Sequence, residues 1–162
     1  MIANKRTLKL KADSTHRHLL EAFVEKVCDD YNIFNSYFGI VMYAVTETFN
    51  NVLLTGRKDE PFDITLNFSG KPNGLYFQFH VGERIYDLGV LLEGKNDSSQ
   101  MEEGDANTMK VVHLLSDHLY LDADKGIVEI GFNIGSINSH LVLERTAALE
   151  HYYSTLNTAT KV

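Results

Sequence analysis

The fold of this 162-residue chain is decided by residues 35 to 56, NSYFGIVMYAVTETFNNVLLTG. Large apolar residues recur there at steps of three and four, and on a helix of about 3.6 residues per turn they form one stripe of Phe38, Val41, Met42, Val45, Phe49 and Val52. The stripe predicts a helix packed into a core, with Gly56 behind it as a C-terminal cap. Glu47, Asn50 and Asn51 lie on the opposite side among further apolar residues. We therefore expect that this side is covered or binds something.

The bulk composition is that of one soluble globular domain. Hydrophobic residues make up 44% of the chain and charged residues 23%, and 162 residues are enough for one substantial core but too few for two. The formal net charge is −7, and no run of lysine and arginine is longer than two residues. Because nucleic acids and anionic membranes attract basic surfaces, the sequence favours a protein or a small molecule as partner.

The sequence also contains no membrane or export signal. No apolar run approaches the roughly 18 residues of a spanning helix, and the N-terminal MIANKRTLKLKAD has no apolar block of the signal-peptide kind. We therefore expect a cytoplasmic protein. The single cysteine, Cys28, cannot form an internal disulfide and is expected to be a small buried hydrophobic residue of an amphipathic helix.

Periodicity along the chain predicts an α+β fold. Alternating residues predict strands at 7–12, 62–68, 75–81, 118–121 and 127–134, and helical spacing predicts helices at 14–30, 109–115 and 139–154 besides the central one. Residues 83–108 have no clear period, and a segment of this kind is usually a lid or is mobile. Helices segregated from hairpin-forming strands favour a two-layer α/β sandwich, with a mixed, mostly antiparallel sheet and helices on one face.

Thr46, Glu47, Asn51 and Val52 match the pattern [ST]-E-x-x-x-N-[AV] in register. This pattern resembles the first motif of the histidine-kinase-like (GHKL, Bergerat-fold) ATPases, in the branch of bacterial anti-sigma serine kinases. The resemblance covers most of residues 6 to 134. It implies a Bergerat-type domain over residues 1–137 and a C-terminal helical extension over 138–162. The family often has a histidine where this chain has Thr55.

The resemblance implies a role for each of several residues. Asn51 would ligate the Mg²⁺ that bridges the phosphates of ATP, and Glu47 would be catalytic by orienting or deprotonating the attacking hydroxyl. Mg²⁺ prefers hard oxygen ligands, and phosphoryl transfer depends mainly on positioning and charge neutralisation. The implied nucleotide-binding positions are Asn50, Asn51, Gly82, Gly104 and Thr108.

The second family motif, an Asp-x-Gly at the end of the third strand, is not kept. Its aspartate accepts a hydrogen bond from the adenine amino group. In FQFHVGERIYD that position falls on His80, Val81 or Gly82, none of which is acidic. An unpaired adenine amine would cost about 1–3 kcal/mol of binding free energy.

The third motif, a glycine-rich turn that holds phosphates, is also eroded. The family's G-G-x-G-L falls on residues 105–109, DANTM, and only the preceding Gly104 is glycine. Asp105 repels phosphate and is better suited to capping the following helix.

Two functions follow from this mixture of kept and lost motifs. The first is a regulatory, anti-sigma-factor-like protein that has lost or weakened ATP binding and acts through protein–protein binding. The alternative is an active ATP-binding serine/threonine kinase that phosphorylates an antagonist domain, with Mg²⁺ and ATP as cofactors. The partners implied are a sigma factor or an anti-sigma antagonist, and a homodimer is possible. An unrelated small-molecule enzyme would need a cluster of titratable groups that the sequence does not contain.

Overall fold

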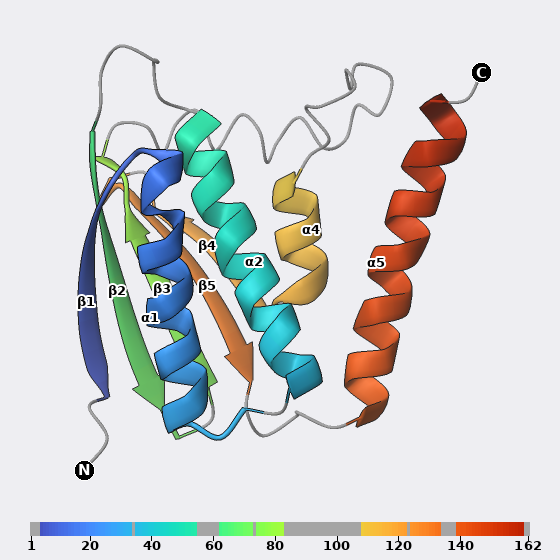
Figure 1. Cartoon of the computed structure of the whole chain (residues 1–162), viewed down its shortest axis with the longest axis horizontal. Coiled ribbons are helices and arrows are strands. Elements are labelled where there is room, and N and C mark those ends of the chain that lie inside the picture. The colour runs from blue at the N-terminus through green and yellow to red at the C-terminus, as the bar shows by residue number, and fades with distance from the viewer. Residues whose placement is uncertain are drawn as a thin grey trace.

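The computed structural model describes residues 4–33, 35–54, 62–72, 74–82, 108–122, 124–133 and 139–160. Helices and strands segregate into layers, as Figure 1 shows, so the predicted α+β class is confirmed. In chain order the elements are β1 (Lys5–Lys11), the 3₁₀ helix η1 (Ser14–His16), α1 (Arg17–Asp30), α2 (Asn35–Leu54), β2 (Asp63–Lys71), β3 (Gly74–His80), α4 (Thr108–Leu115), β4 (His118–Asp122), β5 (Ile127–Asn133) and α5 (Ser139–Thr160).

The five strands form one sheet in the order β1-β2-β3-β5-β4. Each recorded pairing between neighbouring strands is antiparallel. The expectation of a mixed sheet is therefore wrong for the described strands. For two of the four pairings the reason is the connection: β2 and β3 join through a hairpin in which Lys71 pairs with Gly74, and β4 and β5 join through a second short turn. Short connections of this kind can join only antiparallel neighbours.

One face of the sheet forms the core with α1, α2 and α4, which lie together on that face (Figure 1). Side chains alternate along a strand, so every second residue points to the helices. These inward residues are fully buried in the central strands: Ile64, Leu66, Phe68, Leu75, Phe77, Phe79, Val128, Ile130 and Phe132. Three of the phenylalanines form a row across three strands, with ring centroids 5.3 Å apart for Phe68–Phe77 and 6.3 Å apart for Phe77–Phe132.

Helix α2 is buried on more sides than its apolar stripe alone requires. Val41, Val45, Phe49 and Val52 of the stripe have no exposed surface, which confirms the sequence prediction for them. Contacts with α1 on one side and α4 on the other cover the flanks of the helix. Even Asn51, on the polar side, is only 3% exposed.

The boundaries of several elements differ from the prediction. Asp13 caps η1 by accepting a hydrogen bond from the backbone N–H of Thr15, so the α-helix begins at Arg17 and not at residue 14. A side-chain oxygen that satisfies an open amide stabilises a first turn of either kind, and the sequence pattern does not distinguish them. At the other end of the chain, α5 continues to Thr160, six residues beyond the predicted end at 154.

Helix α5 lies beside α4 and away from the sheet (Figure 1). Its Arg145 and Tyr153 reach Tyr37 and Tyr43 of α2 through hydrogen bonds. The side chains that it turns inward recur at helical spacing: Arg145, Ala148, Leu149, Tyr152 and Leu156. The predicted C-terminal helix is therefore present, and it covers the helical layer as an added third layer.

Candidate functional site

The predicted catalytic residue, Glu47, lies in the fourth turn of α2 and is partly buried. Asn50 is one turn further along and donates a hydrogen bond from Nδ2 to Oε1 of Glu47 over 3.3 Å. This contact exists because residues three apart on a helix lie on the same face. Of the predicted residues, α2 thus brings Glu47 and Asn50 into direct contact.

Asn51, the predicted magnesium ligand, forms a hydrogen bond with the backbone of its own helix. Its Nδ2 donates a 2.7 Å hydrogen bond to the backbone oxygen of Glu47. The neighbouring Thr48 does the same with the backbone oxygen of Ala44 over 2.9 Å. Such bonds to the carbonyl one turn back satisfy polar groups inside a helix packed on all sides. Asn51 is therefore a buried residue, with 3% of its surface exposed.

A residue that sequence reasoning missed, Arg17, completes the polar cluster. It is the first residue of α1, and its Nη2 donates a 2.7 Å hydrogen bond to Oδ1 of Asn50. The guanidinium is also close enough to Glu47 to act on its charge. No local pattern pointed to this contact, since Arg17 and Asn50 are 33 residues apart in the chain.

Two side chains, Arg17 of the polar cluster and Thr46 on α2, have unused hydrogen-bonding capacity. Nε of Arg17 and Oγ1 of Thr46 are both buried, and neither has a hydrogen-bond partner in the described part of the chain. Buried polar atoms are nearly always satisfied, and each one that is not costs about 1–3 kcal/mol. The unsatisfied Nε of Arg17 therefore lowers the stability of the α1–α2 contact, and local losses of stability of this kind are found at functional sites.

Burial raises the pKa of the Glu47 carboxyl above its ordinary value, and the hydrogen bond from Asn50 and the charge of Arg17 act in the opposite direction. The carboxylate form is thus disfavoured by its surroundings in spite of two compensating groups. A carboxyl group in this condition is suited to accepting a proton, which is the role that the resemblance implies for it.

We expect Glu47→Gln to stabilise the protein at neutral pH. Because the folded-state pKa of Glu47 is raised, the unfolded chain ionises first as pH rises, and stability is lost between the ordinary pKa and the raised one. Glutamine carries no charge and retains the oxygen that accepts from Asn50. The gain in unfolding free energy, measured by urea titration at several pH values, should vanish below the ordinary pKa of a glutamate. The exposed Glu21→Gln is the matched control for removing one negative charge; a gain for Glu47→Gln that is the same at every pH would contradict the prediction.

Gly82 has a structural explanation that needs no nucleotide. It follows β3 with a φ of 62°, in the left-handed region that favours glycine. Gly126, in the β4–β5 turn, packs against it so closely that a Cβ there would come within 2.8 Å of the Gly82 Cα. The backbone N–H of Val81 donates to the oxygen of Gly126 over 2.9 Å. These two glycines join the end of β3 to the neighbouring hairpin.

The remaining predicted positions are only partly described. Thr108 is the first residue of α4, which packs beside α2. Gly104 and the segment 83–107 lie outside the described residues, as does Thr55. Within the described ranges, no group of three or more histidine, cysteine, aspartate or glutamate side chains could hold a metal ion.

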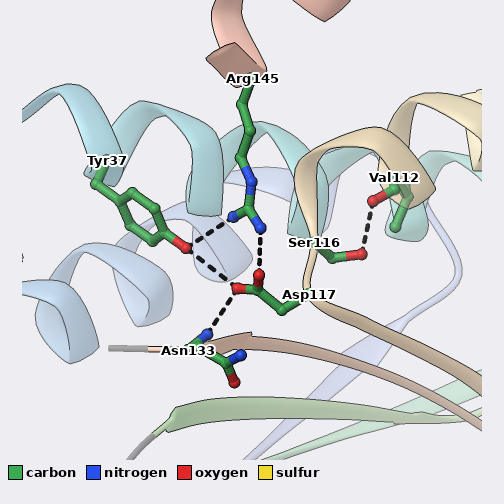
Figure 2. Close-up of polar contacts among 6 residues, drawn as sticks. All are labelled: Tyr37, Val112, Ser116, Asp117, Asn133 and Arg145. Atoms are coloured by element: carbon green, nitrogen blue, oxygen red, sulfur yellow. Dashed lines mark hydrogen bonds and ion pairs between the residues drawn. The ribbon is translucent and has the colours of Figure 1, made fainter. Parts of the chain in front are cut away.

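A second polar cluster, also missed from the sequence, attaches α5 to the body of the protein (Figure 2). Asp117, just before β4, accepts hydrogen bonds at Oδ2 from the backbone N–H of Asn133 over 2.7 Å and from the hydroxyl of Tyr37 over 3.4 Å. Arg145 of α5 forms an ion pair with Asp117 and donates to the Tyr37 hydroxyl over 2.9 Å. Burial raises the pKa of Tyr37 to about 12, so its hydroxyl stays protonated and can donate.

Helix α5 also reaches the neighbourhood of Glu47. The hydroxyl groups of Tyr43 and Tyr153 are hydrogen-bonded to each other, and Tyr43 lies one turn before Glu47 on α2. Lys110 of α4 lies 5.5 Å from the ring centroid of Tyr152. The C-terminal helix therefore contacts α2 one turn before Glu47, as well as at the Asp117 cluster.

In comparisons with known proteins, no protein-family model and no curated protein matches this chain. Among the described helices, none combines the length and the apolar character needed to cross a membrane.

Proposed function

We propose that this protein is a regulatory protein of the anti-sigma type, with a GHKL fold in which ATP binding has been lost or weakened, and that it acts by binding protein partners. The order of elements from β1 to β5 is the order that the resemblance implies up to residue 134. Helix α2, which carries the matching Thr46, Glu47, Asn51 and Val52, is the buried helix of the domain.

The observation that carries the proposal is the position of Arg17. Its guanidinium is hydrogen-bonded to Asn50 and acts on the charge of Glu47, beside the place where the resemblance requires Mg²⁺. Two like charges a few ångströms apart repel each other, so a fixed cation there opposes the binding of a divalent metal. The burial of Asn51 also disfavours the binding of Mg²⁺, because a magnesium ligand must present its oxygen to a partly hydrated ion.

The end of β3 supports the same conclusion. The described residues at this position are His80, Val81 and Gly82, and none offers the carboxylate that the family uses for the adenine amino group. Gly82 is explained by its backbone conformation and by its contact with Gly126. We therefore assign two of the kept residues, the buried Asn51 and Val52, to the stability of the fold and the function to protein binding. A cytoplasmic location, where sigma factors and their antagonists act, belongs to this proposal.

The alternative function, an active ATP-dependent serine/threonine kinase, is favoured by one observation. Burial raises the pKa of Glu47, as a general base requires. In a kinase, Arg17 would contact phosphate and the raised pKa would serve proton transfer.

A thermal-shift titration with Mg-ATP separates the two functions. A ligand present at 100 times its Kd adds about 2.7 kcal/mol to the stability of the folded state, which moves the melting temperature by several degrees. We expect no shift with up to millimolar Mg-ATP. A clear shift that disappears in Asn51→Ala, but persists in a control such as Ser69→Ala on the sheet, would overturn the proposal in favour of the kinase.

The positive test is direct binding. Purified sigma factors and antagonist domains from the source organism should be titrated one at a time against the protein without nucleotide. The proposal expects saturable binding to at least one of them that is unaffected by Mg-ATP. Binding that requires Mg-ATP, or transfer of labelled phosphate to the antagonist, would contradict it.

A further inference from the structure

Helix α5 lies on a surface made by α2, α4 and the residue before β4. Its side chains on that side recur at helical spacing and therefore line one side of the helix: Arg145, Leu149, Tyr152, Tyr153 and Leu156. Three of them contact residues of the other elements, namely Tyr37 and Tyr43 of α2, Lys110 of α4, and Asp117. We call these four residues the α5-binding surface.

The apolar contact that holds α5 is small. Of the described side chains 144–157, only Tyr152 is buried, and 9% of its surface is exposed. On α2, by contrast, Val41, Val45 and Phe49 have no exposed surface. The hydroxyl of Tyr152 is also buried without a hydrogen-bond partner among the described residues, which lowers stability. Elements with few buried apolar contacts open at a lower free energy than the whole fold, so we expect α5 to detach before the sheet unfolds.

Polar contacts at two positions hold α5 in place. Near the start of the helix, Arg145 forms an ion pair with Asp117 and donates to the hydroxyl of Tyr37 over 2.9 Å (Figure 2). About two turns further on, the hydroxyl groups of Tyr153 and Tyr43 are hydrogen-bonded to each other. A carboxylate forms a strong and directional contact with a guanidinium, so the α5-binding surface selects an arginine at one position of the helix that it holds.

Contacts within the rest of the protein position the α5-binding surface. Asp117 accepts hydrogen bonds at Oδ2 from the backbone N–H of Asn133 over 2.7 Å and from the Tyr37 hydroxyl over 3.4 Å. The ring of Tyr37 in turn packs against Phe132 of the sheet, with ring centroids 6.4 Å apart. The carboxylate and the tyrosine therefore stay in place when α5 detaches, and Asp117 then has no arginine.

We propose that the α5-binding surface is a docking site for an amphipathic helix of a protein partner, and that α5 is an exchangeable occupant which this helix displaces. The inference rests on the proposed function in taking the partner to be a protein. Helices that bind in grooves use anchor residues at steps such as i, i+4 and i+7. Helix α5 itself shows which anchors fit, because Arg145, Leu149 and Tyr152 have this spacing. The partner helix accordingly carries the pattern Arg-x-x-x-Leu-x-x-Tyr.

The first test measures whether α5 opens by itself. In the wild-type chain, the amides of α5 should exchange hydrogen faster than those of β3, at the centre of the sheet. Arg145→Glu in the full chain places a second carboxylate beside Asp117 and should accelerate exchange in α5 about tenfold or more, with β3 unchanged. Lys5→Glu makes the same change of charge on β1, away from α5, and should leave exchange in α5 unchanged (Figure 1). Exchange in wild-type α5 no faster than in β3 would overturn the proposal.

The second test supplies the helix as a separate molecule. The probe is a fluorescent synthetic peptide of residues 139–160, SHLVLERTAALEHYYSTLNTAT, whose binding is followed by anisotropy. A tethered helix competes at an effective concentration on the order of 1 mM, so the peptide should bind the Arg145→Glu chain saturably and the wild-type chain about tenfold more weakly or less. A peptide that itself carries Arg145→Glu should bind neither chain. Failure of the natural peptide to bind the folded Arg145→Glu chain would contradict the proposal.

Folding of the Arg145→Glu chain is checked by circular dichroism. If this variant does not fold, Arg145→Leu removes the ion pair without adding repulsion, leaves Asp117 its two other hydrogen bonds, and replaces Arg145→Glu in both tests. A wild-type chain that sediments as a dimer, and as a monomer once Arg145 is changed, would assign the surface to α5 of a second copy and refute the partner helix. Neither test contains nucleotide or a sigma factor, so their failure is distinguishable from failure of the proposed function.

Discussion

Replacing Phe77 with alanine should lower the free energy of unfolding by about 3–5 kcal/mol, the range found for buried aromatic residues. Phe77 is on the central strand β3, has no exposed surface, and contacts the rings of Phe68 and Phe132 on the strands at either side. Truncation leaves a cavity between two strands and α2 that backbone hydrogen bonds keep from closing. Urea titration gives the free energy, and the melting temperature should fall by on the order of 10 °C.

Ser69→Ala is the matched control for this change. Ser69 lies on β2, where its side chain alternates with the buried Phe68 and points away from the core, and it is partly exposed. Substitutions at such positions usually change stability by less than about 0.5 kcal/mol. A Phe77→Ala variant no less stable than the control would show that the three-phenylalanine row does not form the core.

Replacing Asp117 with alanine should cost about 3 kcal/mol of unfolding free energy. Asp117 accepts hydrogen bonds from Tyr37 and from the backbone of Asn133 and forms the ion pair with Arg145, as Figure 2 shows. The Arg145 side chain is only 11% exposed, so removing its partner leaves a nearly buried charge with the tyrosine hydroxyl alone. Hydrogen exchange should then accelerate in α5 before it does in the sheet.

The control for Asp117→Ala is a solvent-exposed ion pair on the protein surface. Lys11 and Asp63 are 61% and 76% exposed in their side chains, and Asp63→Ala should change stability by less than about 1 kcal/mol. Combining Asp117→Ala with Arg145→Leu should cost less than the sum of the two single changes, because the unpaired charge is gone. An additive result would show that Asp117 and Arg145 are not coupled.

Local periodicity was enough to predict most of the elements. The stripe on α2 and the alternation in β2, β3 and β5 name about half of the buried hydrophobic residues, because burial on one side imposes a period of 3.6 or of 2 on the sequence. Predicted boundaries were less accurate at η1 and α5, where capping and the last turns depend on contacts outside the element.

The candidate site was predicted only in part. Glu47 and Asn50 are brought together because they are neighbours on one helix, which sequence spacing shows. Arg17, which gives the cluster its charge, comes from another helix 33 residues away. Asn51 was predicted on the polar side of α2, a side expected to be covered or to bind something, and it is 3% exposed. The sequence did not show that α1 and α4 are the helices packed beside α2.

By itself, the sequence determined which residues are apolar and at what period they recur, and hence the α+β class, the central helix and the strands. The tertiary structure alone decided that β1 lies beside β2 and β5 beside β3, that Arg17 meets Asn50, and that Asp117 holds α5. The physical reason is the separation along the chain of the residues that interact. Hydrophobic periodicity is a property of residues a few positions apart, whereas hydrogen bonds and ion pairs between elements depend on packing that joins residues 28 to 80 positions apart.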